Sequence, residues 1–307
     1  MKKLLTKLFL LALMLQAGSC FARETITILW GFAIGSNQAN TVRAICEELN
    51  KSQDKYTFII GHKPGAGGSI AANDVAANPT NTLVSMSSSF IIRPFYEKTE
   101  ATHNLDNFTP ILVQATGSPL AIASSKFSKL EQLYSAKDVT VGISGVGNIS
   151  HLVSTELANI NPTVNPVNFK STVEAGTAAA GGHIDVAIGF FPDFQSLLDA
   201  NKLTVLGYTG KTEIPGYKNL LLPKNKMPEA SALTANYAIF ASTAMPKDKF
   251  IEIHQMLQSA NNKPLVLESY TRDLLTVSNL NLEQSQAWYS NERKYWGKQV
   301  KRLAVIK

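Results

Sequence analysis

Short β-branched, apolar runs alternate with amphipathic or alanine-rich runs along most of this sequence, and this alternation limits the possible folds most. Strands are expected near 25–30, 56–60, 82–86, 119–123, 139–143, 165–169, 185–189 and 237–241. Helices are expected near 42–49, 69–77, 130–135, 150–160, 172–181, 247–258 and 282–303. Strands that alternate with helices in this way form α/β folds with mainly parallel sheets. We therefore predict an α/β protein built on mainly parallel sheets.

The amino terminus has the order of a secretory signal peptide. Three lysines within the first seven residues precede the apolar run 8–15, and small and polar residues follow it. The apolar run is too short to cross a bilayer of about 30 Å as a helix. We expect cleavage after Ala22 and export to the periplasm. Lipidation of Cys20 is the alternative, which Ala17 disfavours because lipoproteins prefer leucine at that position.

Composition and charge exclude several classes once the predicted signal is set aside. The chain has 307 residues, of which 45% are hydrophobic and 17% charged, as in a folded protein of one large or two ordinary domains. Cleavage removes 22 residues and three lysines, which leaves 285 residues and lowers the formal charge from +6 to +3. Because the mature chain lacks a long basic run and a groove-reading motif, nucleic acid is not an expected partner. It also lacks an uninterrupted run of 18 apolar residues, so we expect a soluble chain.

Cysteines and histidines give no sign of a metal site. With only Cys20 and Cys46, the chain cannot form a disulfide-rich scaffold or a four-cysteine zinc site. Cys46 follows Val42 and Ile45 at helical spacing, so we expect its thiol to be buried on the apolar face of a helix. The five histidines form no close pair and are expected to be capping or surface residues. Since phosphate-loop and dinucleotide motifs are incomplete, we expect neither a metal nor a cofactor.

Loops rich in glycine and serine follow several of the expected strands, at 35–36, 88–89 and 144–150. Ligands of parallel sheets bind beyond the carboxyl ends of the strands. A helix that begins there offers unpaired N–H groups and the positive end of its dipole, which can hold a carboxylate or phosphate without an arginine. Capping and turn formation explain any single loop equally well. Several converging loops favour a binding site for a small anion.

Signatures of enzymes are incomplete. Ser144 lies in a segment near a nucleophile elbow, but the last position of that motif is valine instead of glycine. An exported serine hydrolase would pair Ser144 with His151, for which no orienting acid is identifiable. Asp185 and Asp193 can serve acid–base chemistry, although isolated carboxylates at strand and loop ends are more often structural. We therefore expect a protein that is not an enzyme and has no catalytic residues.

Two segments resemble signatures of the substrate-binding receptors of tripartite tricarboxylate transporters, the Bug family. Residues 61–72 resemble the family's N-K/R-P-G-A-G-G-x-I-G-A, and residues 142–152 resemble its G-S-x-G-x-G-S-x-x-H-L. Weaker matches in the same order occur at 108–111, 169–171, 181–185 and 296–298. The resemblance implies a type II-like, two-lobed periplasmic binding fold with a hinge and an interlobe cleft. It also implies a small organic acid ligand, a membrane permease of separate chains as partner, and a monomer.

The resemblance further implies how the chain divides and where the ligand lies. Lobe 1 would comprise 23–120 and 239–307 and lobe 2 would comprise 121–238, with hinge crossovers near 119–124 and 236–241. Matching positions place the ligand-binding residues on one wall, on the opposite wall and at the rim: Phe32, Gly35, Ser36, Ser88 and Ser89; Ser144, Gly145, Asn148, Ser150 and His151; and Lys170, Ser171 and Phe190.

Three departures from the family pattern bear on the ligand. Ala39 stands where the family usually has aspartate, the family's P-D-G-Y-T is reduced to 79–82, and Ser171 replaces a glycine, which would narrow the cleft. We predict an extracytoplasmic receptor that captures a small organic acid between two lobes and delivers it to a tripartite tricarboxylate-type permease. A binding protein that presents its ligand to a membrane receptor kinase is the alternative.

Overall fold

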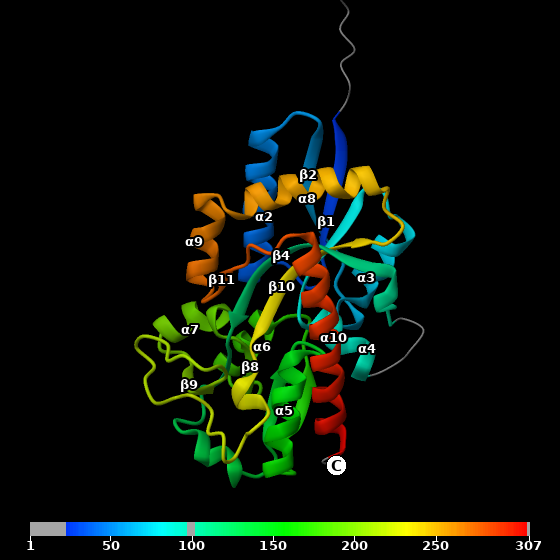
Figure 1. The fold of residues 1–307 in the computed structure, drawn as a ribbon. Coiled ribbons are helices and arrows are strands. Elements are labelled where there is room, and N and C mark those ends of the chain that lie inside the picture. The colour runs from blue at the N-terminus through cyan, green and yellow to red at the C-terminus, as the bar shows by residue number, and fades with distance from the viewer. Residues whose placement is uncertain (1–22, 97–101, 306–307) are drawn as a thin grey trace, which may run out of the picture.

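The computed structural model describes residues 23–96 and 102–305, which form two β-sheets with helices packed around them (Figure 1). The first sheet has the strand order β11-β4-β10-β3-β1-β2 and the second has the order β7-β6-β8-β5-β9. Both predicted signal-peptide positions, Cys20 and Ala22, lie outside the described residues.

The first sheet and its helices come from both ends of the chain. Its strands are β1 (Glu24–Trp30), β2 (Tyr56–His62), β3 (Thr82–Ser87), β4 (Phe108–Ser118), β10 (Ala235–Ser242) and β11 (Thr276–Val277). The helices around it are α2 (Asn37–Ser52), α3 (Ser69–Ala77), α4 (Ser89–Tyr96), α8 (Lys247–Asn261), α9 (Pro264–Arg272) and α10 (Leu282–Val305). Two 3-10 turns, η1 (Ala66–Gly68) and η2 (Leu105–Asn107), complete this part.

The second sheet comes from the middle of the chain. Its strands are β5 (Leu120–Ser124), β6 (Thr140–Ile143), β7 (Asn165–Asn168), β8 (Val186–Phe190) and β9 (Thr204–Tyr208). Its helices are α5 (Ile149–Ile160), α6 (Thr172–Ala180) and α7 (Gln195–Asp199), with the 3-10 turns η3 (Leu130–Tyr134), η4 (Phe191–Phe194) and η5 (Ala230–Ala232).

Pairing within both sheets is mixed. Strand β1 is parallel to β2 and β3, and β6 is parallel to β7 and β8. The strands that carry the chain between the sheets, β4, β5 and β10, pair antiparallel with their neighbours. A parallel pair needs a long crossover, usually a helix, whereas these strands enter from the other sheet. The predicted α/β class is confirmed, and the parallel pairing is limited to the two βαβ regions.

Helix α2 shows how local sequence sets these elements. The Ser36 hydroxyl accepts a hydrogen bond from the Ala39 amide at 3.3 Å and caps the helix, as serine commonly does. Its apolar face, which includes Ile45 and Leu49, is buried. Cys46 is 4% exposed on the same face, and burial raises the pKa of its thiol to about 12. The expected buried, unreactive thiol is confirmed.

The chain passes between the sheets twice. Strand β4 ends at Ser118 in the first sheet and β5 begins at Leu120 in the second, so Pro119 alone separates them. The return occurs between β9 and β10, within 209–234. All of β10 pairs in the first sheet, so the return precedes the 236–241 expected for the hinge. We propose that the lobes divide at Pro119 and within 209–234. Helix α10 runs along the side of both parts and contacts α4, β4 and α5 (Figure 1).

Candidate ligand-binding site

A small cavity lies where elements of the first sheet meet elements of the second. The ends of β1, α2, α4, β4, β10 and the α9–β11 region line one side, and the ends of β6, β8 and α6 line the other. The cavity volume is about 20 Å³, which holds one or two water molecules. A small organic acid is several times larger than water, so it can enter only when the two sides separate. The lining residues are Trp30, Phe32, Ser36, Asn37, Gln38, Ser89, Ser118, Ser144, Ser171, Thr172, Phe190, Pro192, Asp193, Tyr237, Asp273 and Leu275.

The structure brings some of the sequence-predicted site residues to this cavity and places others beside or behind it. Those that line it are Phe32, Ser36, Ser89, Ser144, Ser171 and Phe190. Gly145 and Lys170 line a neighbouring hollow that shares Phe32 and Ser144 with the cavity. Gly35 lines a neighbouring groove that shares Asn37, Pro192 and Asp193 with the cavity. The last four, Ser88, Asn148, Ser150 and His151, are not among the lining residues.

Residues at the start of α5 hold the Ser144 loop in shape. The Ser150 hydroxyl accepts a hydrogen bond from the Ser144 amide at 3.2 Å and lies 3.2 Å from the Ser144 hydroxyl. The Asn148 side-chain amide donates to the Ser144 carbonyl. His151 Nδ1 accepts from the Gly147 amide at 3.3 Å. Ser150, Asn148 and His151 therefore support the wall from behind, and Ser144 shares its hydroxyl with Ser150, not with a general base.

Ser88 supports the opposite wall in the same indirect way. Its hydroxyl accepts a hydrogen bond from the Asn236 amide at 3.0 Å, which ties the end of β3 to the start of β10. The next residue, Ser89, begins α4 and lines the cavity. Of this serine pair, Ser89 is therefore the residue that can reach a ligand.

Hydrogen bonds join the two sides around the cavity. The Ile149 amide at the start of α5 donates to the Ser89 hydroxyl at 3.4 Å. The Arg93 guanidinium of α4 donates to the Val146 carbonyl at 2.5 Å. The Asn37 amide at the start of α2 donates to the carboxylate of Asp193 at 3.1 Å. These contacts connect elements of different sheets, so the structure is a closed arrangement.

Asp193 lies at two helix starts, the kind of position where the sequence predicts that a ligand anion binds. It follows β8 within η4, is 8% exposed, and also accepts a hydrogen bond from the Thr172 hydroxyl. Asn37 and Thr172 are the first residues of α2 and α6, so both helix starts converge on this carboxylate. Burial raises the pKa of Asp193, and the bonds from Thr172 and Asn37 oppose that rise. The two helix starts thus already bind a carboxyl group supplied by the protein itself.

A second carboxyl group lines the cavity from the first sheet's side. Asp273 follows α9 and accepts hydrogen bonds from Arg272 Nε at 3.1 Å and from the Thr41 hydroxyl at 3.4 Å. Burial raises the pKa of Asp273 to about 6, although Arg272 opposes this. Burial, followed by the charges of Asp193 and Asp273, raises the pKa of the lining Tyr237. The two carboxyl groups therefore act on the same space.

Polar groups of the cavity include atoms that the protein leaves unpaired. Trp30 is 2% exposed and Gln38 is 4% exposed, and both line the cavity. The indole Nε1 of Trp30 and the Oε1 of Gln38 have no hydrogen-bond partner within the protein. A buried polar atom without a partner is costly, so these two unpaired atoms are unusual features of residues that line the cavity.

Sequence reasoning missed several lining residues. Trp30 and Tyr237 lie in expected strands with no sign of a binding role, and no motif marks Asp273 or Leu275. Asp193 was noted as a possible acid–base residue, but nothing in the sequence showed that it faces the start of α2. Its place directly after β8, at the carboxyl end of a strand, was the one available signal.

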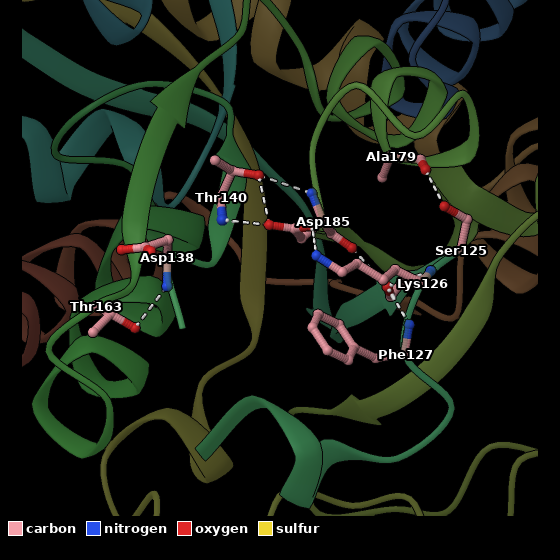
Figure 2. A network of polar contacts seen from close by, with 9 residues as sticks. Ser125, Lys126, Phe127, Asp138, Thr140, Thr163, Ala179 and Asp185 are labelled. Atoms are coloured by element: carbon pink, nitrogen blue, oxygen red, sulfur yellow. Dashed lines mark hydrogen bonds and ion pairs between the residues drawn. The ribbon is translucent and has the colours of Figure 1, made fainter. Parts of the chain in front are cut away.

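Asp185, the other carboxylate considered for acid–base chemistry, has a structural role. Figure 2 shows it accepting hydrogen bonds from the Thr140 amide and hydroxyl, both at 2.9 Å, and pairing with Lys126 Nζ at 2.6 Å. Burial alone would raise the pKa of Asp185, but these bonds together outweigh it and hold the pKa below its usual range. Asp185 therefore ties the start of β6 to the segment before β8.

Comparison with known proteins identifies the family. The family model for the tripartite tricarboxylate transporter family receptor matches residues 41–305. The chain belongs to this family. Comparison with functionally curated sequences returns no significant match.

Solved structures agree with the receptor's fold. The periplasmic binding protein BugD has a TM-score of 0.82 at 20% identity, covering 93% of this receptor and 99% of BugD. Rpa4515 of R. palustris, solved with adipate, has a TM-score of 0.81 at 18% identity, with 93% and 99% covered. MatC from Rhodopseudomonas palustris, with bound malate, has a TM-score of 0.80 at 19% identity, with 91% and 100% covered. The predicted periplasmic binding protein fold is confirmed.

The structure describes residues 23–96 and 102–305 of the receptor. Within them, no helix is both long and apolar enough to cross a membrane. The same ranges contain no group of three or more His, Cys, Asp or Glu side chains arranged to hold a metal ion.

Proposed function

We propose that this receptor captures a small organic acid in the cavity between its two lobes and delivers it to a membrane permease made of separate chains. The observation that carries the proposal is the cavity, whose two sides come from different sheets and are joined by hydrogen bonds around it. Rpa4515 with adipate and MatC with malate support an organic acid as the ligand class.

Opening and closing of the lobes would load the cavity. Pro119 and the 209–234 segment are the two connections at which the lobes rotate, since hinge motion concentrates in a few linking residues. Opening breaks the bonds from Asn37 and Ile149 across the cavity, and closing reforms them around the ligand. Water is then excluded, which strengthens the remaining hydrogen bonds to the ligand. The closed form is the one presented to the permease.

A ligand carboxylate finds donors at the cavity wall. Trp30, Ser36, Ser89 and Ser144 line the cavity, and the Trp30 indole N–H has no hydrogen-bond partner within the protein. Hydrogen bonds to a charged acceptor are about twice as strong as neutral ones, so a few such donors are sufficient to hold the group. The receptor works in the periplasm as a monomer after cleavage of its signal peptide.

Thermal unfolding with a panel of small organic acids tests this proposal. A ligand that binds only the folded state stabilises it by RT ln(1 + [L]/Kd), about 2.7 kcal/mol at a hundredfold excess over Kd. We expect at least one carboxylate to raise the melting temperature in a saturable way. The corresponding amides and alcohols, which lack the charge, are the matched control. If no carboxylate stabilises the protein, the receptor function is wrong.

A further inference from the structure

The cavity that receives the ligand is acidic. Its lining includes the carboxyl groups of Asp193 and Asp273, and no lysine, arginine or histidine of the described chain is among the lining residues. Asp273 has Arg272 beside it, but Arg272 is 54% exposed in its side chain and stands outside the cavity. A dianion in this space would lie beside two buried carboxyl groups, and its charge would oppose the ionisation of both.

Asp193 is held in place by neutral groups only. Its two observed partners are the Asn37 amide and the Thr172 hydroxyl. An ionised carboxylate can accept about four hydrogen bonds, so Asp193 has capacity left for a further donor. A buried carboxyl group without a cation beside it stays ionised only at a cost, and burial accordingly raises the pKa of Asp193. A cationic group of the ligand beside Asp193 would favour the ionised form and pair with it.

The unpaired atoms fit a ligand with both an acceptor and a donor. The buried Trp30 Nε1 can only donate, so it calls for an acceptor such as a ligand carboxylate. The Gln38 side chain donates a hydrogen bond from Nε2 to Gln114 Oε1 at 3.3 Å. Its own Oε1, an acceptor, is unpaired. Gln38 directly follows Asn37, whose amide binds Asp193, so the free acceptor belongs to the same helix start as that carboxylate.

We propose that the ligand carries a cationic nitrogen that pairs with Asp193 beside the carboxylate that Trp30 and the serines bind, so that the site selects amino-carboxylates over dicarboxylates. This rests on the proposed function and narrows its ligand class. Asp193 is then the residue that determines specificity, because it couples the ligand's positive charge to the starts of α2 and α6.

Three probes with the same number of carbon atoms test which end-group charges the site prefers. Glutarate, 5-aminovalerate and cadaverine have the same length and carry two carboxylates, one carboxylate with one ammonium, and two ammonium groups. Calorimetric titration should include this series, the pair malate and aspartate, and the common amino acids. We expect an amino-carboxylate to bind at least tenfold more tightly than the dicarboxylate of equal length. The amino-carboxylate gains a charged hydrogen bond to Asp193, whereas the second carboxylate of the dicarboxylate is repelled there.

The variant Asp193→Asn tests the named residue. The asparagine oxygen can still accept from Asn37, and the Thr172 hydroxyl can turn to accept from the new amide, so the local bonds survive while the charge is lost. The tenfold preference should disappear or reverse in favour of the dicarboxylate. The control is Asp199→Asn, which removes an exposed carboxylate of α7 that accepts from Gln195. It should leave the preference unchanged.

The outcomes distinguish this inference from the proposed function. Tight binding of dicarboxylates with weak binding of every amine overturns the inference and leaves the receptor function intact. Binding of none of the probes overturns both. Cadaverine binding more tightly than 5-aminovalerate overturns the carboxylate half of the assignment. If Asp193→Asn does not fold, the wild-type probe series and Asp273→Asn, which removes the second carboxylate, decide the matter.

Discussion

The Ser150 hydroxyl accepts from the Ser144 amide and touches the Ser144 hydroxyl, yet it is not among the cavity-lining residues. Replacing Ser150 with alanine leaves the buried Ser144 amide unpaired, at a cost of about 1–3 kcal/mol in unfolding free energy. Because the loop then loses its fixed shape, we expect ligand affinity to fall severalfold or more, as measured by calorimetry.

The matched control is Ser154→Ala, on the same helix. Ser154 is also buried, and its hydroxyl donates to the His151 carbonyl at 2.9 Å. The Ser144 amide and hydroxyl hydrogen-bond with Ser150 instead. Ser154→Ala should lower stability by a similar or smaller amount and leave affinity unchanged. Equal losses of affinity in both variants would mean that Ser150 acts only through helix stability.

His103 is buried, whereas it was expected to cap or lie at the surface. Its Nδ1 lies 2.9 Å from the Ser69 hydroxyl and its Nε2 lies 2.8 Å from the Phe90 carbonyl. Burial lowers its pKa to about 4, with the Phe90 bond opposing and Arg93 assisting. The histidine is therefore neutral in the fold at neutral pH.

Stability should consequently fall in mild acid. The unfolded chain takes up a proton near pH 6.5, the ordinary histidine pKa, and the folded chain takes it up only near pH 4. The unfolded state binds more protons in that window, so the free energy of unfolding drops as pH falls through it, by about 3 kcal/mol at most. Urea unfolding from pH 7 to pH 4 should show a shallower drop for His103→Gln; identical slopes would contradict the assignment.

At the residue scale, sequence resemblance located the serine-rich wall better than the acidic one. Ser36, Ser89, Ser144 and Ser171 line the cavity because each stands at the start of a helix or the end of a strand, which sequence can mark. Asp193 reaches the start of α2 from 156 positions away in sequence. Such a contact depends on how the two sheets meet, which no local pattern encodes.

At the scale of elements, glycines shape the turn between β6 and α5. Because they have no side chain, this turn can pack closely against α4. Gly147 has a φ of +77°, and an added Cβ would lie 3.0 Å from Arg93 Cδ and 3.3 Å from Tyr96 Cβ, both on α4. Alanine at 147 should therefore cost about 1 kcal/mol of stability for the backbone strain and also push α4 away. We expect weaker ligand binding through faster dissociation.

Gly216 provides the matched control for this prediction. It has a φ of +84° with no heavy atom near an added Cβ, so alanine there carries the same backbone strain in open space. Gly216→Ala should lose comparable stability and bind ligand like the wild type. Stopped-flow dissociation rates separate the two, and unchanged rates for Gly147→Ala would show that the Arg93 contact does not hold the closed form.

Elements with strong periodicity or clear caps were predicted within a few residues, as for α3 at Ser69–Ala77 and β1 at Glu24–Trp30. Strand β4 was missed because Pro110 argues against a strand. The structure tolerates Pro110 opposite Phe240, where the register shifts. Helix α4 was missed because it begins directly at Ser89 after β3 and contains Pro94. In both cases tertiary pairing outweighed the local signal.

At the scale of the whole molecule, two sheets joined at Pro119 and across 209–234 line a cavity of about 20 Å³. The proposed function requires this volume to open and close. Helix α10 contacts α4 and β4 of the first sheet's side and α5 of the second, and Arg302 of α10 pairs with Glu229 at 3.2 Å. The two-sheet plan followed from the α/β alternation and the family resemblance, whereas the closed geometry needed the structure.

The most direct measurement is calorimetric titration of the best-stabilising carboxylate into the wild type and into Ser144→Leu. Leucine at 144 fills the cavity from a lining position, so it should abolish saturable binding while circular dichroism and cooperative unfolding remain. The account predicts one site per chain in the wild type and none in the variant. Equal affinity in the two proteins would place the ligand elsewhere and contradict the account.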